Sequence, residues 1–177
     1  TACVQVMFAD GTVWSSKQLL NAVTAKPSAT APASNSTTVT ASGLIGTYVG
    51  TANVDTLTAD ATHHELWGQA GNDTLTGFWE STRLIGGAGN DTLIAQGGDA
   101  NVLDGGDGDD VLTGGWGFDI LMGGAGNNTI AGSSWGATIT AGAGNDSITG
   151  LAGEDVINAG DGNNTLNAGG GDDTIWT

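Results

Sequence analysis

A nine-residue period runs from Gly50 to the end of the chain and limits what the chain can fold into. In each frame the eighth residue is aliphatic, and the first six residues are rich in Gly and usually end in Asp. The frame that begins at Gly86, GGAGNDTLI, shows the pattern GGxGxDxUx, in which U is aliphatic. One extra residue, within 95–104, interrupts the series. The eighth positions are Leu57, Leu66, Leu75, Leu84, Leu93, Val102, Leu112, Leu121, Ile130, Ile139, Ile148, Ile157, Leu166 and Ile175.

Each frame predicts a turn followed by a short strand. The glycines allow positive φ and bring backbone carbonyls inward, and the three residues after the turn suffice only for a strand with one inward side chain. Two frames then make one coil, and coils stack at about 4.8 Å. The pattern predicts an all-β protein: a right-handed parallel β-roll (β-solenoid) with a thin aliphatic core.

The repeat resembles the repeats-in-toxin family, also called haemolysin-type calcium-binding repeats. The resemblance covers residues 50–177. It implies Ca²⁺ ions held between stacked turns by backbone carbonyls and by the sixth-position carboxylates of both turns. It also implies a non-catalytic module of a secreted or cell-surface bacterial protein, exported unfolded through a type I secretion channel and folded outside the cell.

The charge balance agrees with a cation as partner. The chain has 19 acidic and 3 basic side chains and a net charge of −16. Repulsion by phosphate groups argues against nucleic acid and anionic membranes, and no apolar run is long enough to span a bilayer. Ordering a residue costs about 1–2 kcal/mol, whereas a buried aliphatic side chain returns about 1.5–3 kcal/mol. With so thin a core, we expect folding to require Ca²⁺.

Alternate frames lie on the same edge of such a roll. The first edge has turns starting at Gly50, Gly68, Gly86, Gly105, Gly123, Ala141 and Ala159. The resemblance makes Asp73, Asp91, Asp110 and Asp146 the leading side-chain ligands of this edge. Asp55 is a weaker candidate because Asn53 replaces a Gly in its turn. Asn128 and Asn164 keep an oxygen but lose a charge, which predicts weaker sites.

The second edge is poorer. Its turns at Gly114, Gly150 and Ala168 carry Asp119, Asp155 and Asp173, but the others place His64, Thr82, Ala100 and Ala137 where Asp belongs. We expect five to seven Ca²⁺ ions, mostly on the first edge. The complete set of candidate ligands carried over from the family is Asp55, Gly71, Asp73, Gly87, Gly89, Asp91, Gly106, Gly108, Asp110, Asp119, Gly124, Gly126, Asn128, Gly142, Gly144, Asp146, Gly153, Asp155, Gly160, Gly162, Asn164, Gly169, Gly171 and Asp173.

Three regions are expected: a small unit at 1–25, a Pro/Ser/Thr linker at 26–40 and the roll at 41–177. The first unit combines a strand ending at Phe8, an Asp10-Gly11 turn and a short helix. Its run FADGTVW resembles a small module found ahead of such repeats. The single Cys3 excludes an internal disulfide.

Aromatic residues gather on the second edge and leave an alternative function open. Exposed aromatic rows can stack on sugar rings, which would make the chain an adhesin or glycan-binding segment. These rings could instead pack against one another, against the linker or against the amino-terminal unit, and the chain could be the non-catalytic tail of a secreted hydrolase or toxin. The aromatic residues in question are Phe78, Trp79, Trp116, Phe118 and Trp135.

No catalytic constellation stands out, so we expect no enzyme activity from this segment. The run His63-His64-Glu65 lacks a third convergent ligand, and we expect it to form a solvated turn rather than a transition-metal site.

Overall fold

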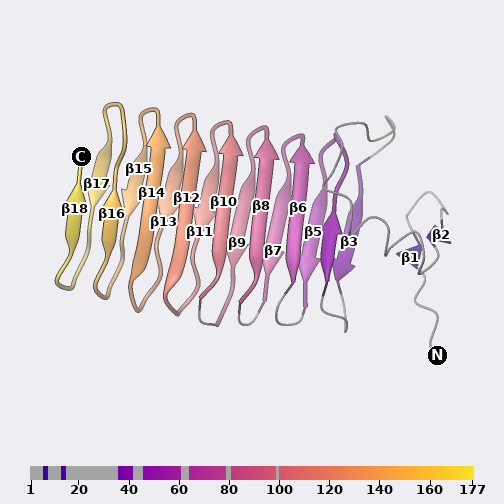
Figure 1. Ribbon diagram of the computed structural model, residues 1–177, viewed down its shortest axis with the longest axis horizontal. Helices are drawn as coiled ribbons and strands as arrows, with labels where there is room; N and C mark the ends of the chain where they lie inside the picture. The colour runs from indigo at the N-terminus through magenta and orange to yellow at the C-terminus, as the bar shows by residue number, and fades with distance from the viewer. Residues whose placement is uncertain are drawn as a thin grey trace.

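The computed structural model describes residues 6–7, 13–14, 36–41, 46–60, 64–78, 81–98 and 100–177. This part of the chain contains strands and turns but no helix. Two parallel sheets of eight strands each form a β-solenoid (Figure 1). The predicted parallel β-roll is therefore confirmed.

The chain alternates between the two sheets, so each coil contributes one strand to each. Sheet 1 contains β4 (Thr47–Val49), β6 (Glu65–Ala70), β8 (Arg83–Ala88), β10 (Val102–Asp107), β12 (Asp119–Ala125), β14 (Ala137–Ala143), β16 (Val156–Asn158) and β18 (Thr174–Trp176). Sheet 2 contains β3 (Thr38–Ala41), β5 (Thr56–Ala59), β7 (Thr74–Gly77), β9 (Thr92–Ala95), β11 (Val111–Thr113), β13 (Thr129–Ala131), β15 (Ser147–Thr149) and β17 (Thr165–Asn167).

The register of the sheets repeats the sequence period. Leu57 pairs with Leu75, and Leu75 pairs with Leu93, so equivalent positions stack directly above one another. Turns that lead from sheet 1 into sheet 2 form the first edge, at the top of Figure 1, and the returning turns form the second edge. Identical turn positions are thereby brought into columns along each edge.

The core is a column of aliphatic side chains. The largest fully buried residues are Leu57, Leu66, Leu75, Leu84, Leu93, Leu103, Leu112, Leu121, Ile130, Ile139, Ile148 and Ile157. The prediction of one inward side chain per strand was incomplete. Around β9, for example, Ala95 in the strand and Asp91 just before it are buried on either side of Leu93, whereas Thr92 and Ile94 between them are partly exposed.

The place of the extra residue corrects the predicted register at one coil. Leu103, not Val102, pairs with Leu84 and joins the buried column, and Val102 pairs with Arg83. Consequently Asn101, not Ala100, takes the sixth position of that turn. Ala100 is exposed and adopts a positive φ of 62°, so the additional residue is absorbed in a bulge of the second edge.

The amino-terminal region is described only in part. β1 (Val6–Met7) pairs with β2 (Val13–Trp14) in an antiparallel arrangement. The predicted Asp10-Gly11 turn and short helix lie outside the described residues. β3 starts at Thr38, within the segment predicted as a linker, and pairs with β5 as part of the roll. None of the described residues forms a helix long and apolar enough to cross a membrane.

Candidate metal-binding turns

Wherever the sixth residue of a turn is Asp or Asn, it ties neighbouring coils together through one side-chain oxygen. Asp91 Oδ1 accepts a hydrogen bond from the backbone N–H of Asp73, 2.7 Å away, and Asp110 Oδ1 accepts from the N–H of Asp91 at 2.7 Å. The same bond recurs along the first edge as far as Asn164, and on the second edge at Asn101, Asp119, Asp155 and Asp173. One carboxylate oxygen thus has a structural role.

The second carboxylate oxygen is buried without a donor in five of these turns. No hydrogen-bond donor of the described residues reaches this oxygen, Oδ2, although it has essentially no contact with solvent. A buried charge without a partner is unfavourable, so these oxygens mark places where a cation fits. The five residues are Asp73, Asp91, Asp110, Asp146 and Asp155.

A backbone carbonyl from the next coil faces each free oxygen wherever the turn starts with Gly. A Cβ added to Gly86 would collide with Asp91 Oδ2 and lie 2.6 Å from the carbonyl oxygen of Gly105. On the second edge, a Cβ at Gly150 would collide with Asp155 Oδ2 and with the Ala168 carbonyl oxygen. Oxygens of two coils therefore converge in the space that the missing side chain leaves open.

The backbone of these turns has a recurring conformation, with positive φ at the second and fourth positions. Every predicted glycine ligand has this conformation, for example Gly87 at 115° and Gly89 at 126°. Gln69 and Leu151, both at 84°, adopt it without being Gly. All five turns with a free Oδ2 belong to this class: the 68–73, 86–91, 105–110, 141–146 and 150–155 turns.

Two Asp turns have a different backbone and satisfy their own carboxylate. Thr51 and Asn53 lack positive φ, and the N–H of Thr51 donates to Asp55 Oδ2 at 2.5 Å. Gly115 likewise lacks positive φ, and its N–H donates to Asp119 Oδ2 at 2.7 Å. These two candidate ligands therefore differ from the five above in having no free oxygen.

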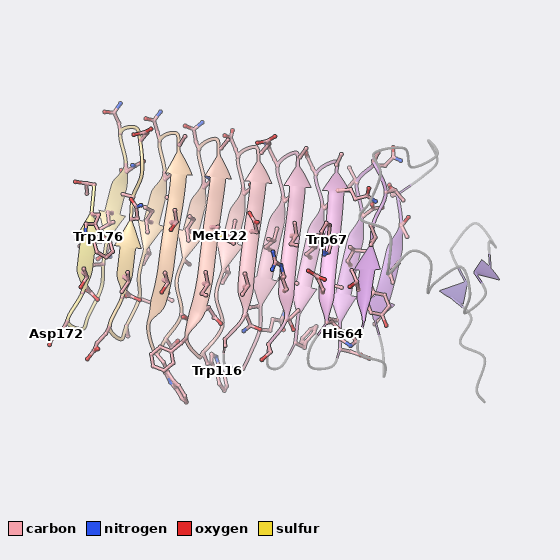
Figure 2. The ribbon with its side chains drawn as sticks, in the orientation of Figure 1. His64, Trp67, Trp116, Met122, Asp172 and Trp176 are labelled. Atoms are coloured by element: carbon pink, nitrogen blue, oxygen red, sulfur yellow. The ribbon has the colours of Figure 1, made fainter. Side chains whose placement is uncertain are left out.

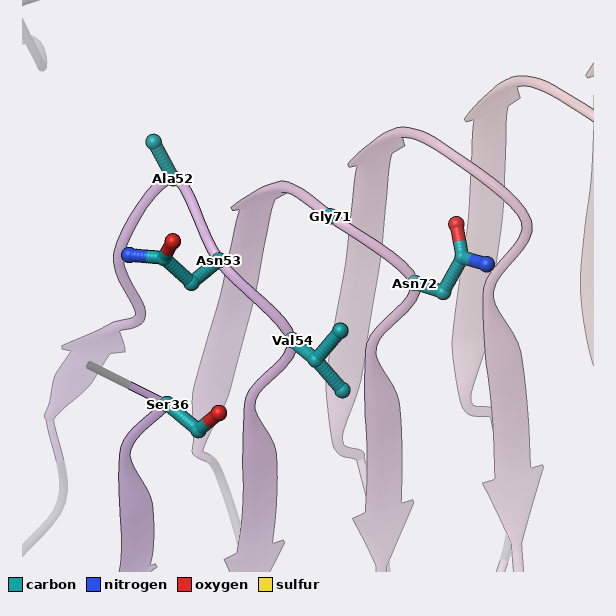
Figure 3. Close-up of a pocket in the computed structure, with 6 residues that line it drawn as sticks. All are labelled: Ser36, Ala52, Asn53, Val54, Gly71 and Asn72. Carbon is teal, nitrogen blue, oxygen red and sulfur yellow. The ribbon is translucent and has the colours of Figure 1, made fainter. Parts of the chain in front are cut away.

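Figure 3 shows the first of these turns beside its neighbour, where Ala52, Asn53 and Val54 border an open depression next to Gly71 and Asn72. A Cβ at Gly71 would lie 2.5 Å from the carbonyl carbon of Asn53. The two turns thus touch backbone to backbone although their conformations differ.

Burial changes the acidity of the carboxyl groups on the first edge. Removal from water raises the pKa of Asp73 to about 7, and repulsion from Asp91 and Asp55 adds to the increase. Burial also raises the pKa of Asp91 and of Asp110 to about 6, with repulsion from neighbouring carboxylates contributing in both cases. Burial raises the pKa of Asp155 as well. A bound cation would lower these pKa values again, because it stabilises the charged carboxylates that burial disfavours.

The fifth turn positions form a second, exposed ladder that the sequence analysis did not predict. The N–H of Asn90 donates to Asn72 Oδ1 at 2.9 Å, and that of Asp109 donates to Asn90 Oδ1 at 3.0 Å. The series continues through Asn127, Asn145 and Asn163. In Figure 2, side chains that end in oxygen and nitrogen project from the top of the roll, along the first edge. The repeated Asn or Asp before each sixth position was the available sequence signal.

The second edge differs in its side chains. His64 is buried at a sixth position, and neither ring nitrogen has a partner within the described part of the chain, so the prediction of a solvated turn was wrong for this residue. Its ring packs edge-on against the ring of Tyr48, with the two ring centroids 5.4 Å apart. His64, Trp116 and Asp172 lie along this edge in Figure 2. Trp116 is 70% exposed and Trp135 is 58% exposed.

The donor set suits a hard cation bound mainly by oxygen. Across the described residues, no three His, Cys, Asp or Glu side chains form a metal cluster. An ion at Asp91 would therefore need backbone carbonyls as well as carboxylate oxygen. Ca²⁺ takes six to eight oxygen ligands in flexible geometry, and carbonyls and carboxylates are among its usual ligands. The buried oxygens and carbonyl-lined turns therefore fit Ca²⁺.

Fold and turns together define a calcium-binding β-roll. Residues 49–77, 76–99, 97–130 and 137–166 match the family model of the RTX calcium-binding nonapeptide repeat, in four copies. These matches cover more than half of the chain, which belongs to this family. No curated protein and no solved structure matches the chain. The β-roll of this family is a structural calcium-binding module, typical of secreted proteins and generally non-catalytic.

Proposed function

We propose that this chain is a folding module of a larger secreted bacterial protein, and that Ca²⁺ outside the cell drives it into the β-roll. The observation that carries the proposal is the set of five buried Asp Oδ2 atoms that have no donor among the described residues. Family membership supports the choice of Ca²⁺ and the extracellular setting, since RTX repeats occur in secreted proteins. Export through a type I channel is the family's usual context.

The energetics favour a fold that depends on calcium. Without a cation, the roll buries carboxylates that repel one another, and water would solvate them in the unfolded chain. With free Ca²⁺ at ten times Kd, each site contributes about 1.4 kcal/mol, so five sites supply about 7 kcal/mol. This is comparable to the whole stability of an ordinary domain, about 5–15 kcal/mol. Calcium can therefore decide whether the roll forms.

The experiment is a Ca²⁺ titration of the metal-free chain followed by far-ultraviolet circular dichroism, with Mg²⁺ at matched ionic strength as control. Mg²⁺ demands near-octahedral geometry and releases its water reluctantly, so it should not replace Ca²⁺. We expect a β signal that rises with Ca²⁺ and disappears on addition of a chelator. Identical spectra of verified metal-free and Ca²⁺-loaded samples would refute calcium-driven folding.

A second candidate function is glycan binding by the aromatic residues of the second edge. Trp116, Phe118 and Trp135 are each more than half exposed. Large exposed aromatic surfaces are typical of interaction sites, and aromatic rings stack on sugars. Binding to an oligosaccharide array that is lost in both Trp116→Ala and Trp135→Ala would support this function. The absence of calcium-dependent binding to any oligosaccharide on the array would refute this function.

A further inference from the structure

Three turns carry Asn at the sixth position, and their amide groups behave differently from the carboxylates. Asn128 Oδ1 accepts the N–H of Asp110 at 3.0 Å, so it keeps the bond between coils that an Asp would make. This bond fixes the orientation of the amide, because only the oxygen can accept. The amide nitrogen must then occupy the position of the second carboxylate oxygen.

In that position the Asn128 nitrogen donates to backbone carbonyls. Nδ2 lies 3.3 Å from the carbonyl oxygen of Gly126 in its own turn and 3.3 Å from that of Ala141 in the next coil. The other two amides donate to a carbonyl of their own turn: Asn164 Nδ2 to that of Ala159 at 2.8 Å, and Asn101 Nδ2 to that of Gly97 at 2.9 Å. Asn101 Nδ2 also donates to Asp119 Oδ1 in the next coil, 3.0 Å away. In all three turns the amide nitrogen thus donates to a carbonyl of its own turn, where a carboxylate oxygen could only accept.

Two adjacent turns of the first edge show the same position occupied by a carboxylate oxygen in one and by an amide nitrogen in the other. A Cβ at Gly105 would collide with Asp110 Oδ2 and lie 2.6 Å from the Gly123 carbonyl, so two oxygens meet there. A Cβ at Gly123 would lie 2.7 Å from Asn128 Nδ2 and collide with the Ala141 carbonyl, so a donor meets an oxygen there. Both turns have positive φ at the second and fourth positions. Only the side-chain chemistry differs between them.

We propose that Asn at the sixth position replaces the calcium ion, so that the turns of Asn101, Asn128 and Asn164 are closed without metal. The inference rests on the proposed function. It changes the expectation for Asn128 and Asn164 from weak sites to no sites. Calcium would then occupy separate groups of turns: a continuous run at Asp73, Asp91 and Asp110, a single turn at Asp146 and one on the second edge at Asp155.

The test counts ions per chain by equilibrium dialysis and elemental analysis, and measures thermal unfolding with and without chelator. Asn128→Asp should bind one more Ca²⁺ than the wild type and melt at a lower temperature in chelator. The reverse variant, Asp110→Asn, should bind one fewer and melt higher in chelator. The control is Asn145→Asp, which adds the same charge at an exposed fifth position and should leave the ion count unchanged.

The outcomes separate this inference from the proposed function. A wild type that binds no calcium overturns both. A wild type that binds calcium while Asn128→Asp and Asp110→Asn keep its ion count overturns only the inference. Because Asp110→Asn retains the bond from the N–H of Asp91 through its amide oxygen, that variant stays informative even if Asn128→Asp fails to fold.

Discussion

Asp110 uses one carboxylate oxygen to accept the N–H of Asp91 from the preceding coil, while its other oxygen meets no donor within the described residues. The two oxygens of one side chain therefore have separate tasks. Oδ1 links this coil to the preceding one, and the buried Oδ2 is a negatively charged atom that a cation would stabilise. Substitutions can remove these tasks together or one at a time.

Asp91→Ala should remove both the hydrogen bond between coils and the candidate metal ligand, whereas Asp91→Asn should remove only the metal ligand. The alanine leaves the buried N–H of Asp73 without its acceptor, which costs about 1–3 kcal/mol. In saturating Ca²⁺ we expect urea unfolding to rank stability as wild type, then Asp91→Asn, then Asp91→Ala. Equal midpoints for the two variants would show that the bond between coils contributes nothing.

Gly89→Ala should destabilise the roll by more than about 1 kcal/mol, since a left-handed backbone disfavours a Cβ. Gly89 has φ of 126°, and its Cβ would collide with the Gly71 carbonyl oxygen in the adjacent coil. Gly170→Ala is the matched control, because nothing lies within 4 Å of its Cβ. Its unfolding temperature in Ca²⁺ should match the wild type, and a Gly89→Ala protein of unchanged stability would contradict the turn geometry.

The corrected register predicts opposite outcomes for two neighbouring residues. Leu103 is fully buried, so Leu103→Ala should cost about 2–5 kcal/mol. Val102 is only partly buried in β10, so Val102→Ala should cost much less. Chemical denaturation in saturating Ca²⁺ measures both. A larger loss for Val102→Ala would place the extra residue after Val102.

Acid should partly replace calcium in the metal-free roll. Burial raises the pKa of Asp73 to about 7 and of Asp91 and Asp110 to about 6, against about 3.9 in an unfolded chain. The folded state therefore binds more protons than the unfolded state between about pH 4 and 7, and its stability falls as pH rises through this window.

In chelator we accordingly expect more β signal at pH 5 than at pH 8. A triple Asp→Asn variant at positions 73, 91 and 110 should show a weaker pH dependence, which distinguishes these groups from the general effect of negative charge. More structure at pH 8 than at pH 5 in chelator would contradict the assigned burial. With Ca²⁺ present the trend should reverse, because protons compete for the ligand oxygens.

Most of the fold was predictable because one short pattern repeats. A column such as Leu57, Leu75 and Leu93 has a single way to become buried, which sets the period, the two sheets and the stacked turns. The extra residue was harder to place, because Val102 and Leu103 are both aliphatic. The structure decides between them by the burial of Leu103 and by the role of Asn101, which accepts from the N–H of Thr82 and whose own N–H donates to Asp119.

The sequence predicts which Asp residues occupy the sixth turn positions, but not which of their carboxylates keep a free oxygen. The sequence places Asp55, Asp91 and Asp119 at the sixth position of their turns. It does not show that N–H groups of Thr51 and Gly115 close two of these turns, because that depends on φ values of individual residues. Glycine permits either sign of φ, so GGWGFD and GGAGND read alike as motifs. His64 was misjudged because its own turn sequence gives no sign of burial.

Because consecutive turns alternate between the two edges, the edge on which a turn lies depends on whether an odd or an even number of nonapeptides precedes it. Removing one nonapeptide would send every later turn to the opposite edge, so that the two columns would be mismatched at the junction; without residues 86–94, for example, Asp110 would stack on Thr82 instead of on Asp91. Removing two nonapeptides would shorten the rod by one layer and leave all columns intact. Length variation should therefore be tolerated in steps of eighteen residues, the usual spacing between paired positions, and a single odd residue only where a bulge such as that at Ala100 absorbs it.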